Sequence, residues 1–139
     1  MNSEFWINLP VRDVAAATGF FRKLGFAFNE ERTNDAMACM LMGDKNVVVM
    51  LFPEDQFSGF SGSGVADTSR GAEVLFSIDA QSPHEVDAFI EKVRAAGGKV
   101  FAEPAEADGW MYAAGFADPD GHRWSVLYMD ETKMPGAAT

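Results

Sequence analysis

The sequence predicts an α+β fold in which two βαβββ modules follow one another along the chain. Both halves have the same order of patterns: a strand, a helix that ends at glycine, two strands, a turn and a last strand. Single residues also recur at a nearly constant interval. Arg22, Gly25, Asp44 and Leu51 of the first half correspond to Arg94, Gly97, Asp120 and Leu127 of the second. Such self-similarity at a fixed spacing indicates an internal duplication.

The clearest turn in the chain supports the same fold class. In Asp118-Pro119-Asp120-Gly121, proline presets φ at the first corner, aspartate accepts local backbone hydrogen bonds, and glycine takes a site with positive φ. Residues 110–116 lead into this turn and residues 122–128 lead out of it, and both runs are rich in aromatic and branched side chains. The sequence therefore predicts a β-hairpin that closes the second module.

The first module begins with alternating apolar residues at positions 5–11, which is the period of a half-buried strand. Asp13 is suited to cap a helix over 14–24, and Gly25 is suited to end it. Three further strands are predicted at 26–31, 35–42 and 46–52. The last of these is apolar at nearly every position from Val47 onward, so we expect both of its faces to be covered.

Residues 54–70 differ in composition from their surroundings, since Gly and Ser alternate with Phe57 and Phe60. Gly and Ser are typical of a flexible connector, and the two phenylalanines indicate that the segment is anchored. A lid that folds over a cleft and a plain linker between modules are both compatible with this pattern.

The second module repeats the plan, starting with a strand at 72–79. Ser82-Pro83-His84-Glu85 forms a capping box, which predicts a helix over 83–96 before Gly97-Gly98. We expect a strand at 99–103, a loop at 104–109, and then the hairpin. Residues 131–139 have no core pattern, which predicts a flexible tail.

Composition excludes several classes of partner. The formal net charge of the 139 residues is −10, which argues against nucleic acid and anionic membranes as partners. Hydrophobic residues make up 47 % and charged residues 23 %, as in ordinary globular proteins. The single cysteine, Cys39, cannot form an internal disulfide, and residues 1–20 lack the pattern of an export signal. We therefore expect a cytoplasmic protein.

The opening Leu9-Pro10-Val11-Arg12-Asp13, the duplicated βαβββ plan and the closing Asp118–His122 motif resemble those of the vicinal oxygen chelate superfamily. This group contains glyoxalases, bleomycin-resistance proteins and extradiol dioxygenases. The sequence is especially similar to its bacterial branch of predicted lactoylglutathione lyases. The resemblance implies tandem modules that form a curled mixed-sheet cup within one domain, 1–130. Module one would span about 4–53, residues 54–70 would connect, and module two would span about 71–130.

The resemblance also implies where a divalent metal would be held, on the first and fourth strands of each module. Its motif falls on Trp6 and Glu73 for the first strands and on Ser125 and either Val49 or Met50 for the fourth. Only Glu73 offers the carboxylate or imidazole that such a metal prefers. We therefore expect no bound metal and no other cofactor, which argues against metal-dependent lyase or dioxygenase chemistry.

Glu73 has two interpretations. If it lies on the cup face among aromatic walls, it could act as a general base or as the partner of a cationic ligand. Alternatively, it is a strand-end carboxylate that pairs with Arg70. We select it as the candidate catalytic residue. The candidate ligand-binding residues combine aromatic walls with a few polar groups: Trp6, Asn8, Glu73, Ser77, Trp110, Tyr112 and Ser125.

Two functions remain open. The first is metal-free binding of a small molecule in the cup, as in antibiotic sequestration. The alternative is an enzyme of the same superfamily, a lyase or dioxygenase that uses Glu73 or a metal held by unexpected residues. In either case we expect a homodimer, because an open half-cup leaves sheet edges and an apolar face to be covered.

Overall fold

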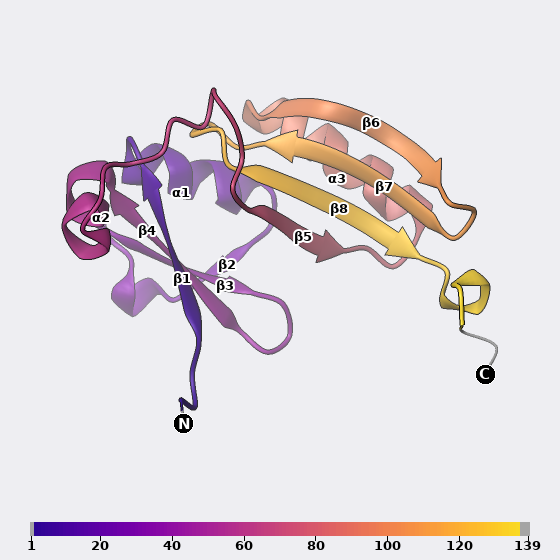
Figure 1. The fold of residues 1–139 in the computed structure, drawn as a ribbon, viewed down its shortest axis with the longest axis horizontal. Helices are drawn as coiled ribbons and strands as arrows, with labels where there is room; N and C mark the ends of the chain where they lie inside the picture. Colours follow the sequence, from indigo (N-terminus) through magenta and orange to yellow (C-terminus); the bar gives the residue numbers. More distant parts are fainter. Residues whose placement is uncertain (1, 137–139) are drawn as a thin grey trace. The chain divides into compact units, whose positions relative to one another are not determined.

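The computed structural model describes residues 2–136, which form two compact units that divide between Ser69 and Arg70 (Figure 1). Each unit contains a four-stranded sheet that mixes one parallel pair of strands with two antiparallel pairs. A helix packs on each sheet. The predicted α+β fold of two tandem βαβββ modules is therefore confirmed.

The first unit contains β1 (Trp6–Val11), α1 (Val14–Lys23), β2 (Ala27–Phe28), β3 (Ala38–Met42) and β4 (Val47–Pro53). Its strands lie in the order β1-β4-β3-β2, and β1 runs parallel to β4. Asp13 caps α1 as predicted, since its carboxylate accepts a 3.0 Å hydrogen bond from the backbone N–H of Ala16.

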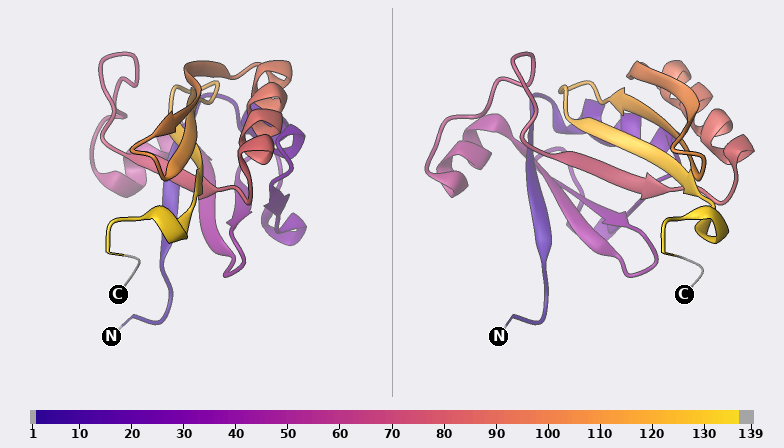
Figure 2. Two further views of the ribbon diagram at one scale, coloured as in Figure 1. Left: turned by 90° about the vertical axis from the view of Figure 1, so that its right-hand side faces the viewer. Right: turned by 45° about the vertical axis from the view of Figure 1, so that its right-hand side comes forward.

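The second unit repeats this arrangement with β5 (Leu75–Asp79), α3 (Pro83–Ala96), β6 (Lys99–Ala107), β7 (Met111–Ala117) and β8 (Arg123–Met129). The strand order is β5-β8-β7-β6, and β5 runs parallel to β8. Figure 2 shows α3 along one face of this sheet, where it contacts β6, β7 and β8. Ser82 caps α3 by accepting a hydrogen bond from the Glu85 N–H, as predicted.

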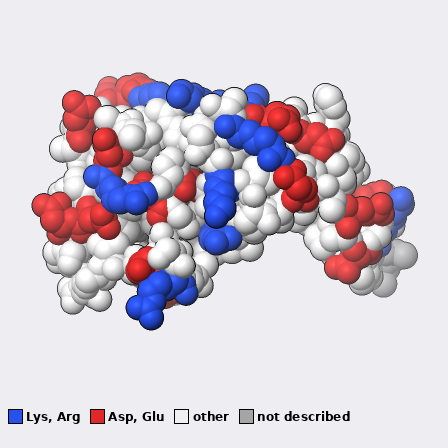
Figure 3. Space-filling model, turned by 90° about the horizontal axis from the view of Figure 1, so that it is seen from above, with Lys and Arg blue, Asp and Glu red and all other residues white. Residues whose placement is uncertain are grey.

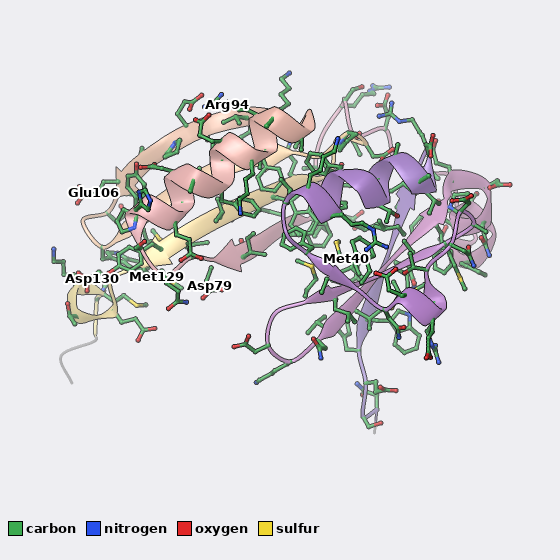
Figure 4. All side chains as sticks on the ribbon, turned by 180° about the vertical axis from the view of Figure 1, so that it is seen from behind. Met40, Asp79, Arg94, Glu106, Met129 and Asp130 are labelled. Carbon is green, nitrogen blue, oxygen red and sulfur yellow. The ribbon has the colours of Figure 1, made fainter. Side chains whose placement is uncertain are left out.

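Each unit has its own core, on the face of its sheet that the helix covers. In the first unit, Phe20 and Phe21 of α1 are buried, and fully buried Met40 of β3 lies beneath that helix (Figure 4). In the second unit, Phe116 and Trp124 stack in parallel with ring centroids 6.2 Å apart, and Phe89 of α3 packs on Phe116. Burial of these large side chains is the main favourable contribution to folding of each unit.

A repeated ion pair reflects the duplication at the level of side chains. Arg22, at the end of α1, donates two 2.7 Å hydrogen bonds to the carboxylate of Glu30. Arg94, near the end of α3, forms the corresponding pair with Glu103 of β6. The two arginines are those that recur in the sequence, so the repeat preserves a contact between each helix and the strand region that follows it.

Three strands are shorter than predicted because asparagines or turns interrupt them. The expected strand at 26–31 is only β2, since Asn29 caps a 3₁₀ turn at Glu30–Arg32. The expected strand at 35–42 begins at Ala38, because the Asn34 side chain accepts hydrogen bonds from the N–H groups of Ala36 and Met37. In the second unit the strand starts at Leu75 rather than 72, where its partner β8 also begins. The fourth strand is buried mainly on one face, with Val49 and Leu51 inside.

Two other segments are more regular than predicted. Residues 54–61, expected to be connector, form the helix α2 (Glu54–Ser61), and Phe60 packs edge-on against Phe52 of β4 with centroids 5.1 Å apart. The expected loop after residue 103 continues as β6, which accommodates Pro104 at the sheet edge through register shifts. The predicted tail contains a 3₁₀ turn, η2 (Glu131–Lys133), and its last residues, 137–139, lie outside the described part. No helix among the described residues is both long and apolar enough to span a membrane.

Candidate functional site: the open face of the second sheet

The second sheet has two unlike faces because side chains alternate along its strands. Trp124 and Val126 of β8 point to the face that α3 covers and are almost completely buried. Their neighbours point to the opposite face, which no helix of this unit covers within residues 70–136. We call this second face the open face; its defining residues are Leu75 and Ser77 of β5, Phe101 of β6, and Arg123, Ser125 and Leu127 of β8.

The centre of the open face is a pair of hydroxyls. Ser77 and Ser125 are directly paired on the parallel strands β5 and β8, and their Oγ atoms are 2.7 Å apart, so one hydroxyl donates to the other. On the other side of Ser125 its partner is Gly115 of β7, which in turn pairs with Ala102 of β6. These residues form one row across all four strands.

Phe101 completes this row through a close approach to glycine. It is the extra residue where the register shifts between Val100 and Ala102, and a Cβ atom at Gly115 would lie 2.5 Å from its ring. The ring therefore covers the backbone of Gly115, and no other amino acid fits there without displacing it. Phe101 remains 43 % exposed, and Leu75, in the neighbouring row on β5, remains 58 % exposed, so the open face has apolar surface close to the hydroxyl pair.

Arg123 lies in the next row, beside Leu75 on β5. Its guanidinium is stacked over the Phe101 ring, with the carbon of the group 4.5 Å from the ring centroid. Within residues 2–136 this guanidinium forms no ion pair with a carboxylate. The open face therefore combines a fixed cation, two hydroxyls and exposed apolar side chains.

The hairpin turn that starts β8 is held by a buried carboxylate. Asp118, 5 % exposed, accepts hydrogen bonds from the backbone N–H groups of Asp120 and His122, each 3.0 Å, and from the Trp124 indole at 3.1 Å. Burial raises the pKa of this carboxyl, and the charge of His122 and the indole hydrogen bond oppose that rise. Because Asp118 holds Trp124 and Arg123 is the preceding residue, this turn also fixes the position of Arg123 on the open face.

The predicted site residues of the second unit are distributed over four places. Ser77 and Ser125 lie together on the open face. Glu73 precedes β5, is exposed, and forms no ion pair with Arg70 in the described part of the chain. Tyr112 points toward α3, where its hydroxyl donates a 2.7 Å hydrogen bond to Asp87, which raises the pKa of Tyr112. Trp110 lies in the turn between β6 and β7, and its carbonyl accepts a hydrogen bond from the N–H of Asp130.

The predicted residues of the first unit share one face of β1. Trp6 and Asn8 are two residues apart and exposed, and they pair with Val48 and Met50 of β4. The register also decides between the two candidates on β4: Val49 is buried on the helix side, and Met50 shares the face of Asn8.

These residues do not fit a divalent metal of the kind the family resemblance implies. The motif positions Trp6, Glu73, Met50 and Ser125 carry an indole, one carboxylate, a thioether and a hydroxyl, whereas such a metal prefers several imidazole and carboxylate ligands. Among the described residues no three His, Cys, Asp or Glu side chains gather in a way that could hold a metal ion.

Sequence reasoning did not identify Arg123 and Phe101. Both could have been placed on the face of Ser125 by counting alternate residues from Trp124 and by treating the strand glycine Gly115 as a sign of close approach. The bulge at Phe101 has no clear sequence signal, and without it the stacking on Arg123 cannot be inferred.

Comparison with known proteins agrees with this architecture. The sequence profile described as the Glyoxalase/Bleomycin resistance protein/Dioxygenase superfamily matches residues 5–126. The chain belongs to this superfamily. A search of curated proteins found no match.

Several solved structures are similar to this chain. A hypothetical protein, SA1046, from S. aureus is 32 % identical over 92 % of this chain and 95 % of its own, with a TM-score of 0.82. A glyoxalase/bleomycin resistance protein/dioxygenase family enzyme from Burkholderia phytofirmans PsJN is 18 % identical over 89 % and 96 %, with a TM-score of 0.76. A lactoylglutathione lyase from Agrobacterium tumefaciens is 19 % identical over 92 % and 95 %, with a TM-score of 0.67. The last two share the fold.

Proposed function

We propose that this protein binds a small organic molecule on the open face of its second sheet, without the divalent metal that its superfamily commonly uses. The observation that supports this most is the Ser77–Ser125 pair, with Oγ atoms 2.7 Å apart at the centre of the face. Hydroxyls are poor ligands for a divalent metal at neutral pH, but they are good hydrogen-bonding partners for an organic ligand.

The surroundings of the pair suit a small-molecule site. Such sites are mostly apolar and contain a few polar groups that orient the ligand. Leu75 and Phe101 provide exposed apolar surface close to the pair, and Arg123 provides a charge held in place by the Phe101 ring. We also propose a cytoplasmic location, which the single cysteine supports.

The substitution Ser125→Leu tests this proposal, because it replaces the central hydroxyl with apolar bulk. A panel of small aromatic and aliphatic compounds is titrated into the nitrogen-labelled protein after chelation of metals, and proton–nitrogen correlation spectra are recorded. We expect shifts in β5 and β8, and binding at least about tenfold weaker in the variant. Ser3→Leu, the same change outside both sheets, is the control and should bind as the wild type does. Shifts confined to other strands would contradict the proposal.

An enzymatic function is the alternative, and one observation favours it. Glu73 is an exposed carboxylate just before β5 that no cation pairs with among the described residues, so it is free to act as a base. One structurally similar protein, from Agrobacterium tumefaciens, is named lactoylglutathione lyase, which is the name of an enzyme. Turnover of the methylglyoxal–glutathione adduct, with or without added Zn²⁺ or Ni²⁺, and its loss in Glu73→Gln would establish this alternative. We expect no turnover.

A further inference from the structure

We propose that the ligand of the open face is a small organic monoanion whose carboxylate binds Arg123. This inference rests on the proposed function and adds the chemical class of the ligand. Glu73 considered alone suggests a cationic ligand. The structure favours an anionic one, because the Arg123 cation is held on the open face by Phe101 and Glu73 lies before the start of β5.

The first unit shows what a satisfied guanidinium looks like in this protein. Arg22 is stacked over the Phe28 ring at 4.7 Å, and its edge donates two hydrogen bonds to Glu30. Arg123 has the same aromatic support from Phe101, but no carboxylate meets its edge within residues 2–136. A guanidinium in this state offers a planar fork of N–H donors that matches carboxylate and phosphate oxygens.

A second cation lies in the same row as Arg123. The row runs from Leu75 through Arg123 and Ala117 to Lys99, the first residue of β6. Lys99 is exposed, and it too has no ion pair with a carboxylate in the described part of the chain. Two cations in one row favour an anion there, even though the formal charge of the whole chain is −10.

The hydroxyl pair can add a hydrogen bond to the same ligand. Each serine has one O–H donor, and the bond within the pair uses only one of the two. The remaining O–H is available in the row next to Arg123, at a spacing of about 7 Å along β8. A ligand anion bound by Arg123 can therefore receive a further donor from this pair, and Phe101 and Leu75 offer apolar contact to the rest of the molecule.

The acidic residue on this face limits the ligand to a single negative charge. Asp79 points to the same face as Ser77, two residues further along β5, and accepts a 3.2 Å hydrogen bond from the Gln81 amide (Figure 4). It lies on the opposite side of the hydroxyl pair from Arg123. A second anionic group at the far end of a ligand would therefore meet a carboxylate, which is unfavourable.

Four naphthalene derivatives of similar shape test the charge of the ligand: naphthoate, naphthalenemethanol, naphthamidine and naphthalene dicarboxylate. Each is titrated into the full chain, and the shifts of the backbone amides of β5 and β8 and of the Arg123 Nε–H are followed. We expect naphthoate to bind at least about tenfold tighter than the alcohol, a difference of about 1.4 kcal/mol, and to shift the Arg123 Nε–H. The dicarboxylate should bind no tighter than naphthoate.

Variants separate a specific contact from a general effect of charge. Arg123→Gln should reduce the affinity for naphthoate to that for the alcohol. Phe101→Leu retains apolar surface but removes the aromatic support, so it should weaken naphthoate binding severalfold. Lys92→Gln removes one positive charge from the exposed surface of α3 and should leave the affinity within about twofold. The spectrum of each variant also reports whether it is folded.

The outcomes distinguish this inference from the proposed function. If the alcohol binds the open face as tightly as naphthoate, or if Arg123→Gln has no effect, the monoanion inference is wrong and the proposed function stands. If naphthamidine binds tightest and Glu73→Gln weakens it, the ligand is a cation and the inference is overturned. If none of the four compounds shifts β5 or β8, the proposed function fails as well.

Discussion

Asp118 stabilises both the hairpin turn in which it lies and the position of the Trp124 side chain. The sequence correctly predicts the Asp-Pro-Asp-Gly hairpin. In this turn the Gly121 N–H donates a hydrogen bond to the Asp118 carbonyl, and Gly121 has a φ of +84°. The sequence does not reveal that the Asp118 side chain is buried and accepts a hydrogen bond from Trp124. That contact depends on how β8 packs under α3, which local pattern does not specify.

Asp118→Asn should destabilise the protein. The amide oxygen can still accept from the two backbone N–H groups, but the amide nitrogen would face the Trp124 N–H, and the indole donor would be left unsatisfied. We expect a loss of about 1–3 kcal/mol in the free energy of unfolding at neutral pH. Urea denaturation measures this loss, with Asp44→Asn at an exposed turn position as the control.

The difference in the free energy of unfolding between the wild type and Asp118→Asn should depend on pH. The pKa of Asp118 is raised in the folded state, so the folded protein takes up this proton before the unfolded chain does as pH falls. The wild type should therefore gain stability relative to Asp118→Asn as pH falls from neutral, and the gain should be complete below the ordinary aspartate pKa of about 3.9. A difference that shrinks on acidification would mean that the folded state stabilises the charged form.

For helices and strands, the sequence predicts which elements form better than it predicts the residues at which they begin and end. Capping residues such as Asp13 and Ser82 define the helix starts because their hydrogen bonds are local. The helix α2 was expected to be a connector because its Gly and Ser content outweighs its two phenylalanines. It forms because Phe60 packs on Phe52 and because Gly62 ends it in the left-handed conformation. Tertiary contact here overrides local propensity.

Phe60→Ala tests this explanation of α2. The ring contact with Phe52 should contribute about 0.5–1.5 kcal/mol, and Phe60 itself is largely exposed, so global stability should fall by no more than that. Amide hydrogen exchange of residues 54–61 should accelerate much more than exchange in β4. Phe5→Ala, which removes an exposed ring before β1, should change neither. Unchanged exchange in α2 would show that the contact does not hold the helix.

For the whole molecule, the negative net charge does not by itself indicate a surface that binds cations. The net charge of −10 arises from 21 acidic and 11 basic residues, and on the face displayed in Figure 3 the two kinds are interspersed. The duplication was predictable because it repeats residues at fixed spacing, and the Arg22–Glu30 and Arg94–Glu103 pairs repeat with it. The positive charge of the candidate site could not be predicted from the sequence, because it depends on the contacts of Arg123.

We predict that the protein is a homodimer. β1 and β5 are edge strands of their sheets, and large apolar side chains beside them, such as Trp6 and Val74, are more than half exposed. Edges and apolar surface of this kind are commonly covered by a second copy related by two-fold symmetry. Light scattering at micromolar concentration should give twice the mass of one chain. A stable species with the mass of one chain would rule out this assembly.

One paired titration can show whether the open face binds its ligand without a divalent metal. The affinity for naphthoate is measured on the same preparation after exhaustive chelation and after addition of Zn²⁺, Ni²⁺ or Mn²⁺, and the bound metal is quantified. Because Glu73 is the only carboxylate among the metal positions, we expect affinities equal within about twofold and less than one metal ion per chain. A tightly held metal ion on every chain, with binding that is lost on chelation and restored by the metal, would show that the ligand site depends on a metal.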